Sequence, residues 1–586
     1  MHAITARTQI HPKMAWGLTR LNGRDIVLEV VKKFGFVLGI LGFCVILYLP
    51  DTSGMWVSSL KVVLRHSRDD VVAMVGTSDL EVDCENLSSA LQKAESIHVD
   101  VPKDFEETGR KGIQLSEGGT TLYEVTESQM DGLKRTLALA LLMAIFWITE
   151  TLPIPVVALF PMIFLPLLGV THFSRASMPG YFVAFSPYMH YLIVLFIGGF
   201  TIAEAMKKWQ LHERIALQFV RLIGFSPKRI ILSFMVATAA VSMFVSNTAT
   251  AAMMMPIGLA IILSTGESPM KSNFGRALML GIAYAASIGG IGTLIGTPPN
   301  LVLAAFADTL LGKTITFRDW LLIGLPLVAI LLPVTWLVLL RLNPIGEVKM
   351  PASRRVVEDR LKKLGRLRGG ERNTLCIFVL VAVLWVFREW WTSALHLPWV
   401  NDSVIGMIGL VLFYTVPVNI RKWEFTMDWK TNLQIPWGTL LLFGGGLTLG
   451  RALAETGAAE YLAMHLVGLR MLPTVLLLFT VVLLVDFLTE ITSNTATTNM
   501  MMVVLCCLGS AIGECPLLLM VGGAVAASMA FMLPVATPPN AIVYGTGYVE
   551  MKDMVKNGFV LDWIAAAVWT LLLYFVLSRI SGALHL

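Results

Sequence analysis

The side chains best suited to bind a small ion belong to a pentapeptide that occurs twice in the chain. Ser-Asn-Thr-Ala-Thr stands at residues 246–250 and returns unchanged at 493–497, 247 residues further on. Thr-Pro-Pro-Asn follows each copy, at 297–300 and at 537–540. Hydroxyl and carbonyl oxygens are the ligands that hard cations such as Na⁺ prefer, while hydroxyl and amide donors can hold an anion. Two copies at matching places indicate a duplicated polar site.

Further oxygens come one helical turn before each copy. Ser242 precedes Ser246 by four residues, and Thr489 stands at the matching place before Ser493. Both hydroxyls can point toward the pentapeptide that follows. The alternative is that small hydroxyl residues only pack helices together, as they commonly do in membranes; the second identical copy favours a site. Neither motif contains Lys or Arg, so we expect bound cations to offset the charge of any dianion held there.

The elements that position these residues are predicted to be membrane helices. Of the 586 residues, 55% are hydrophobic and only 15% are charged, whereas soluble proteins carry about 25% charged residues. Apolar runs such as 137–148, 321–340 and 564–577 approach membrane-spanning length once their flanks are included. The composition predicts an all-α polytopic protein of a cell membrane, either a bacterial inner membrane or a eukaryotic plasma membrane. No basic stripe with interleaved aromatic residues indicates a nucleic-acid partner.

Basic residues predict the orientation of the chain, because cytoplasmic loops are rich in Lys and Arg. Four such residues come shortly before the first apolar run, so residues 1–33 are predicted to be a cytoplasmic tail and 34–50 the first transmembrane helix. Residues 51–132 then form an extracytoplasmic loop, which contains a glycosylation-like sequence at Asn86. The basic segment 342–373 is predicted to be a second cytoplasmic region.

The first pentapeptide lies in the middle of a 35-residue segment, 229–263. As a helix this segment would be about 50 Å long, too long for one crossing of a ~30 Å hydrocarbon core and too short for two. A single crossing would also place the basic segment 342–373 outside. We therefore expect a re-entrant hairpin, whose non-helical tip is tolerated at membrane depth only if it is buried or lines a cavity.

The second half repeats this pattern and predicts two inverted repeats, since its hairpin enters from the other face. Counting spans gives about 11 transmembrane helices plus two re-entrant hairpins, with the C-terminus extracytoplasmic. The predicted boundaries are a first repeat 133–341, with hairpin 229–263 and broken helix 277–306, and a second repeat 374–586, with hairpin 473–512 and broken helix 517–546.

Acidic side chains within apolar sequence are functional candidates by default. Asp486 and Glu490 precede the second pentapeptide, and the first repeat has no acid at the matching places. They could tune cation affinity or carry protons; the alternative is that they face water or pair with a neighbouring helix. Glu204 is expected at a helix end near water, and Glu150 in a loop beside Pro153.

Enzyme classes find little support in the chain. It has no Gly-x-Ser-x-Gly elbow, no His-Glu-x-x-His motif and no recognisable pair of intramembrane aspartates. The chain is therefore not expected to be an enzyme. An anion channel is the alternative of a different class, although a channel would not need two occluding hairpins.

The motifs resemble those of a known transporter family. SMFVSNTATAAMMMP (242–256), IGTPPN (295–300), TEITSNTAT (489–497) and ATPPN (536–540) look like the divalent anion/sodium symporters, which carry di- and tricarboxylates or sulfate. The resemblance runs from about residue 134 to the C-terminus. It implies a homodimer in which a transport domain moves like an elevator against a scaffold domain, embedded in the lipid bilayer.

Carried over position by position, the resemblance implies two sodium sites and one site for a small dianionic substrate. The first sodium site would use Ser242, Ser246, Asn247 and Gly296, and the second would use Thr489, Thr492, Asn494 and Ala536. The substrate would contact Asn247, Thr248, Thr297, Ser493, Asn494, Thr495 and Pro538.

The expected function is sodium-coupled symport of small dicarboxylates of the succinate, malate and fumarate type. A sulfate, phosphate or citrate carrier, or a sodium-independent dicarboxylate exchanger, remains open on the same scaffold. The two matching tips favour a ligand with two anionic ends. We expect sodium ions as the co-transported partner and no organic cofactor.

Overall fold

The computed structural model describes residues 23–48, 97–100, 112–117, 120–170, 184–269, 272–346, 353–367, 369–464 and 471–577. Most of the expected tail 1–33, most of the expected loop 51–132 with Asn86, and the last nine residues of the expected second repeat lie outside these ranges. So do seven residues of the expected basic segment 342–373.

The prediction of a helical membrane protein is confirmed. Within the described ranges, eight helices are long and apolar enough to cross a membrane, and a ninth crossing is available if the pair α18–α19, bent by 77°, is one span. The helices of the first half are α1 (Gly23–Leu47), α6 (Glu127–Thr149), α7 (Ile154–Val157), α8 (Phe160–Leu167), η1 (Ser186–Met189), α10 (Tyr191–Lys208), α11 (Leu211–Ile223), α12 (Pro227–Ser242), α13 (Asn247–Ser264), α14 (Asn273–Ile291), α15 (Pro298–Leu311) and α16 (Phe317–Leu342).

The second half follows after α17, an amphipathic helix within the basic segment. The linker helix α17 spans Ser353–Leu364. The helices of the second half are α18 (Gly370–Val386), α19 (Arg388–Ala394), α20 (Asp402–Thr415), η2 (Ile420–Lys422), α21 (Trp429–Asn432), α22 (Trp437–Thr456), α23 (Ala458–Met464), α24 (Thr474–Ile491), α25 (Asn494–Ile512), α26 (Pro516–Ala526), α27 (Pro538–Tyr544), α28 (Met551–Leu572) and η4 (Leu573–Leu577).

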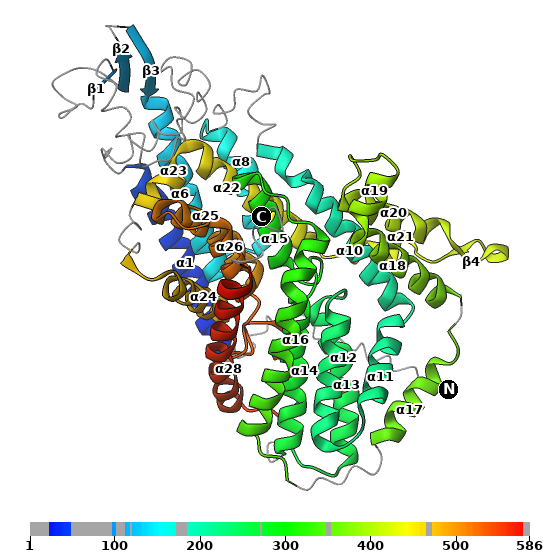
Figure 1. The fold of residues 1–586 in the computed structure, drawn as a ribbon. Helices are drawn as coiled ribbons and strands as arrows, with labels where there is room; N and C mark the ends of the chain where they lie inside the picture. Colours follow the sequence, from blue (N-terminus) through cyan, green and yellow to red (C-terminus); the bar gives the residue numbers. More distant parts are fainter. Residues whose placement is uncertain are drawn as a thin grey trace, which may run out of the picture.

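Short strands complete the described structure. β1 (Ile97–Asp100), β2 (Gly112–Glu117) and β3 (Thr120–Thr126) form an antiparallel sheet just before α6, in the order β1-β2-β3. β4 (Pro417–Asn419) and β5 (Glu424–Phe425) form a two-stranded ribbon that projects from the bundle beyond α20 (Figure 1).

Proline and glycine set the ends of the helices that carry the motifs. Pro298 and Pro538 are the first residues of α15 and α27, where a missing backbone N–H costs nothing. Gly312 and Gly513 end α15 and α25 in the left-handed conformation, with φ of 62° and 76°, which glycine adopts without strain.

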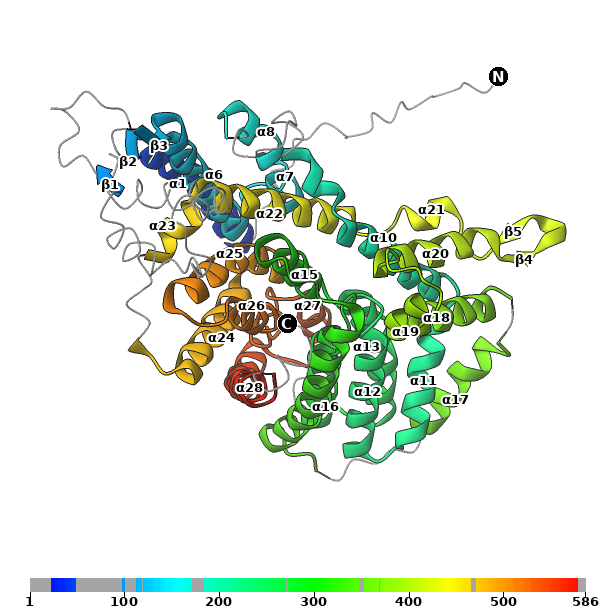
Figure 2. The same cartoon turned by 45° about the horizontal axis from the view of Figure 1, so that its top comes forward.

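The two halves of the chain interlock through their short broken helices. α15, from the first half, packs against α22, α25 and α26 of the second half. In return, α27 of the second half packs against α13 and α14 of the first. Figure 2 shows α15 and α27 side by side between α11 to α14 with α16 on one side and α24 to α26 with α28 on the other. Each Thr-Pro-Pro-Asn segment is thereby brought to the helices of the other half.

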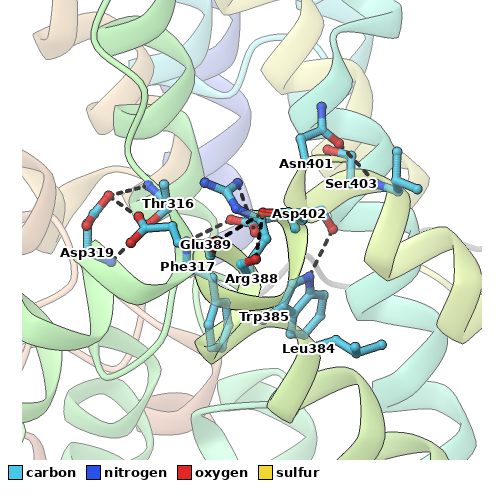
Figure 3. A network of polar contacts seen from close by, with 12 residues as sticks. Thr316, Phe317, Asp319, Leu384, Trp385, Arg388, Glu389, Asn401, Asp402 and Ser403 are labelled. Atoms are coloured by element: carbon cyan, nitrogen blue, oxygen red, sulfur yellow. Dashed lines mark hydrogen bonds and ion pairs between the residues drawn. The ribbon is translucent and has the colours of Figure 1, made fainter. Parts of the chain in front are cut away.

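A polar network ties the start of α16 to α18–α20 (Figure 3). The Asp402 carboxylate accepts a hydrogen bond from the Phe317 backbone N–H at 2.8 Å and pairs with Arg388 at 3.2 Å, while the Asp402 carbonyl accepts from Trp385 Nε1 at 2.9 Å. Thr316 and Asp319 form a capping box at the start of α16. A capping box satisfies backbone donors that a helix start leaves free, so this end of α16 is firmly anchored.

Candidate functional site

A cavity of about 1130 Å³ lies where the two pentapeptides meet. Both Ser-Asn-Thr tips and both Thr-Pro-Pro segments contribute to its wall. Of the candidate residues, all but Ser242 and Thr489 line it directly: these are Ser246, Asn247, Thr248, Gly296, Thr297, Thr492, Ser493, Asn494, Thr495, Ala536 and Pro538. Segments from four separate parts of the chain thus share one space.

The first tip brings three oxygens together. α12 ends at Ser242 and α13 begins at Asn247, so the chain between them is not helical. The Ser242 hydroxyl lies 2.8 Å from Asn247 Oδ1 and 2.7 Å from the Ala286 carbonyl oxygen of α14. One hydroxyl has only one proton to donate. The cluster therefore has more lone pairs than hydrogens, which suits a cation.

The second tip repeats this geometry with a different hydroxyl residue. Thr489 Oγ1 lies 2.8 Å from Asn494 Oδ1 and 3.1 Å from the Ala527 carbonyl oxygen. The side chains of Thr489 and Ser242 are both fully buried. The duplicated sequence therefore produces a duplicated arrangement of oxygens. α24 and α25 hold the second set in the same way as α12 and α13 hold the first.

The broken helices contribute backbone to each tip in matching ways. Thr297 and Thr537 are extended, with φ/ψ of −142°/145° and −141°/145°, just before α15 and α27 begin. Asn300 Nδ2 donates to the Gly290 and Thr293 carbonyls at 3.0 and 2.7 Å. Asn540 Nδ2 donates to the Ala530 and Leu533 carbonyls at 3.3 and 3.0 Å. Each asparagine of Thr-Pro-Pro-Asn thus holds the unwound segment before it.

Gly296 is packed tightly among backbone oxygens of the first tip. A Cβ added there would lie 2.4 Å from the Gly290 oxygen and 2.9 Å from the Met243 oxygen. The Thr293 hydroxyl donates to that same Met243 carbonyl. Main-chain oxygens of Met243, just after α12, and of Gly290, near the end of α14, therefore lie close to Gly296, and Gly290 itself lies against Asn247.

Two hydroxyls of the implied sodium sites are engaged in local structure. Ser246 caps α13, its Oγ accepting from the Ala249 N–H at 3.4 Å. Thr492 Oγ1 lies 2.8 Å from the Leu488 carbonyl and 2.5 Å from Thr497 Oγ1. The ligand roles of these residues stay predictions, and so do those of the other residues carried over from the resemblance.

Sequence reasoning did not place any charged residue in the wall of the cavity. Glu150, Glu204 and Lys207 line it as well, together with the neutral amide of Gln434. Glu204, expected near water at a helix end, is only 6% exposed and pairs with Lys207 at 2.5 Å. The spacing of Glu204 and Lys207 is that of an i,i+3 helical pair, which indicates the pairing but not the cavity they face.

Glu490 holds the backbone that leads to the second Thr-Pro-Pro. Its Oε1 accepts from the Met532 N–H at 2.6 Å and its Oε2 accepts from the Leu533 N–H at 2.9 Å. A carboxylate that accepts two backbone N–H groups is a strong, directional clamp. In the first repeat Met243 stands at the matching place, and the Trp320 Nε1 instead donates to the Ile291 carbonyl at 2.8 Å.

A second cavity, of about 890 Å³, lies beside the network of Figure 3. Its charged side chains include Asp308, Arg388, Glu389 and Asp402. They have partners close by: Asp308 approaches His190 at 3.3 Å, and Glu389 pairs with Arg318 at 2.5 Å. Its polar groups serve the packing of α16 on α18–α20, so the first cavity is the candidate site.

Replacing Asn300 with alanine should weaken the first tip. The change removes the donor for two buried carbonyls, each of which costs about 1–3 kcal/mol when left unpaired. We expect a lower melting temperature and weaker sodium stabilisation for Asn300→Ala, and the same for Asn540→Ala at the second tip, by thermal melting with and without Na⁺. Melting curves unchanged from the wild type would contradict this role. Asn401→Ala, which removes the cap at the start of α20 far from the tips, should lower the melting temperature but keep the wild-type sodium stabilisation.

The fold and the cavity together define a class of protein. A polar cavity between two duplicated unwound tips, inside a bundle of membrane-length helices, is the arrangement of a secondary transporter. Comparison with known proteins leads to the same class. Residues 129–577 match the family described as the sodium:sulfate symporter transmembrane region. The chain belongs to this family, the divalent anion/sodium symporters, and is a transporter rather than an enzyme.

Curated relatives cover most of the chain. The sodium-dependent dicarboxylate transporter SdcS of Staphylococcus saprophyticus is 40% identical over 459 residues, which make up 76% of this chain and 86% of that protein. The protein of the same name from Staphylococcus aureus is 39% identical over 457 residues, with the same shares.

Two solved transporter structures are also similar. YdaH of Alcanivorax borkumensis is 16% identical and covers 68% of this chain and 86% of its own, with a TM-score of 0.48. MtrF of Neisseria gonorrhoeae is 11% identical and covers 72% and 94%, with a TM-score of 0.49.

Proposed function

We propose that the protein carries small dicarboxylates across a cell membrane together with sodium ions. The observation that carries this proposal is the pair of matching oxygen clusters at the two tips, which open on one cavity. Neither tip contains Lys or Arg, and the Lys207 charge in the cavity wall is paired with Glu204. Cations at the tips would supply the positive charge that a dianion needs in a low-dielectric site.

Two features support a dicarboxylate as the anion. The tips are matched, which suits a ligand with an anionic group at each end. The SdcS relatives are described as sodium-dependent dicarboxylate transporters. We assign the first sodium ion to Ser242, Ser246, Asn247 and Gly296, and the second to Thr489, Thr492, Asn494 and Ala536. The substrate then lies between the tips against Asn247, Thr248, Thr297, Ser493, Asn494, Thr495 and Pro538.

The proposed mechanism is an elevator within a homodimer. The part that carries the cavity contains α12 to α15 and α24 to α28, whose broken helices interlock. The fixed part contains α10, α18 and α20, which pack on one another. The basic segment around α17 is placed on the cytoplasmic side, with the N-terminus, and the C-terminus on the other side. The two hairpins then enter the membrane from opposite faces. A pair of inverted repeats with this arrangement can expose the site to either side in turn, as alternating access requires.

Uptake into proteoliposomes tests the proposal. Labelled succinate should accumulate under an inward Na⁺ gradient and should equilibrate only slowly when choline replaces Na⁺. Unlabelled malate and fumarate should compete, and sulfate should not. Uptake that is indifferent to Na⁺ would indicate an exchanger, competition by sulfate alone would indicate a sulfate carrier, and a flux without saturation or counterflow would indicate a channel.

A further inference from the structure

Three carboxyl groups lie together in the interior of the second half. Asp486 and Glu490 are one helical turn apart on α24, and Asp562 is on α28, which packs against α24. Their residues are 0%, 1% and 0% exposed. α28 comes so close here because Gly558 lies against the turn after α26: a Cβ at Gly558 would be 2.4 Å from the Phe531 oxygen. Asp562 follows Gly558 by one turn on the same face.

Only one of the three carboxyl groups is satisfied. Glu490 accepts the Met532 and Leu533 N–H groups. Neither oxygen of Asp486 has a hydrogen-bond partner, and the Asp562 carboxyl group has at most a long contact with the Phe531 backbone N–H. Buried polar groups in proteins are almost always hydrogen-bonded, so an ionised Asp486 would be costly here.

A tyrosine from the other half of the chain reaches the same place. The Tyr284 hydroxyl, on α14, is fully buried and also has no partner. Its ring lies 5.1 Å from the ring of Phe531, the residue that α28 packs against. The Ser528 hydroxyl, one turn before Phe531, is likewise buried and unpartnered. Groups from α14, α24, α28 and the turn after α26 therefore lie near one another.

No positive side chain offsets these charges within the described elements packed around them. α26 contains no titratable group, and the charged residues of α16 (Arg318, Asp319 and Arg341) lie at its ends. At the start of α28, Asp553 pairs with Arg276 at 2.8 Å and Lys552 pairs with Glu550 at 2.7 Å; Lys556 is at that end too. Like charges held close in an apolar interior cannot all stay ionised.

We infer that Asp486 and Asp562 form a proton-binding site beside the second tip. A proton suits this place because two buried carboxyl groups lie close together without a positive partner. A proton on either aspartate removes one of the like charges. Both oxygens of Glu490 are occupied by the Met532 and Leu533 backbone N–H groups.

Proton occupancy then acts on the second tip through Glu490. Loss of the proton adds a negative charge one turn from Glu490, whose clamp holds the Met532–Leu533 backbone that leads to Ala536 and Thr537. The competent state is the protonated one, so its population falls as pH rises. This consequence for uptake rests on the proposed transport function, whereas the proton itself can be measured directly.

Infrared spectroscopy of the purified full-length protein measures the proton. We expect the carbonyl stretch of a protonated carboxyl group at pH 7.5, lost in the double variant D486N/D562N and kept in D359N, whose carboxyl group is exposed on α17. A wild-type spectrum without such a band, or one that the double variant leaves unchanged, overturns the inference, and so does a Na⁺-induced shift of these carboxylate bands. A wild-type spectrum without the band overturns the inference even if the double variant fails to fold, and the single variants then assign any band that is seen.

The pH profile of sodium-driven succinate uptake is the second readout. Above pH 7 the substrate keeps a constant charge, because carboxylic acids titrate near pH 4. Wild-type uptake should fall about tenfold for each pH unit once the pair loses its proton, whereas Asp562→Asn and Asp486→Asn, which mimic the protonated group, should transport with a flat profile. A variant with the wild-type profile, or with fewer coupled Na⁺ ions, contradicts the inference.

Discussion

Sodium should no longer stabilise the protein against heat when Asn247 or Asn494 is replaced by alanine. Each asparagine supplies the oxygen that the hydroxyl of the preceding helix approaches, at 2.8 Å in both tips. Losing the contact between this amide oxygen and a bound sodium ion costs about 1.5–3 kcal/mol, which lowers the sodium affinity roughly 10–100-fold. At a fixed sodium concentration this removes the stabilisation that ligand binding confers on the folded state.

A thermal-shift series with Na⁺ and with choline, each with and without succinate, measures this effect. Succinate should stabilise the wild type only when Na⁺ is present. Both variants should melt at the same temperature in Na⁺ and in choline. Asn419→Ala, in an exposed turn outside the cavity, should respond like the wild type. If Asn247→Ala or Asn494→Ala kept the full sodium response, the assignment of that tip would be wrong.

Gly296→Ala is expected to damage the first sodium site by crowding rather than by loss of a ligand. The new methyl group would lie 2.4 Å from the Gly290 oxygen and 2.9 Å from the Met243 oxygen. Both atoms are backbone, so neither can turn away as a flexible side chain could. Overpacking of this kind costs about 1–3 kcal/mol and displaces the backbone, and the displaced atoms include the oxygens that surround the first tip.

Sodium-dependent uptake of succinate, measured over a range of sodium concentrations, checks the glycine prediction. Gly296→Ala should need at least about tenfold more sodium for half-maximal uptake. Gly346→Ala is the matched control, because a Cβ there meets nothing within 4 Å. Equal sodium dependence in the two variants would show that the tight packing around Gly296 has no part in cation binding.

Short-range features of the site follow from the sequence. The repeated Ser-Asn-Thr, with Ser242 and Thr489 one turn earlier, predicts where hydroxyl and amide oxygens can meet, because helical spacing alone brings residues four or five apart into reach. Pro298 and Pro538 mark helix starts for an equally local reason. The class of protein follows from composition, since bilayer thickness dictates long apolar helices.

Long-range packing could not be read from spacing. Nothing in the sequence indicates that α15 packs on α25, or that α27 packs on α13, because those contacts depend on how whole helices dock. The pairing of Glu204 with Lys207 is local, yet its place in the cavity wall depends on how α10 packs beside the cavity. Asp486 could be singled out as an acid in apolar sequence, but its neighbour Asp562, 76 residues further on, could not.

The exchange of α15 and α27 between the halves has a consequence for biogenesis. Because α27 and the residues before it come from the last tenth of the chain and pack on α13 and α14, the surroundings of the first tip stay incomplete until synthesis is nearly finished. Contacts between such distant segments form late in folding. A ribosome-stalled chain ending before residue 538 should therefore insert its first hairpin without gaining a sodium response, although every first-site side chain is already in place.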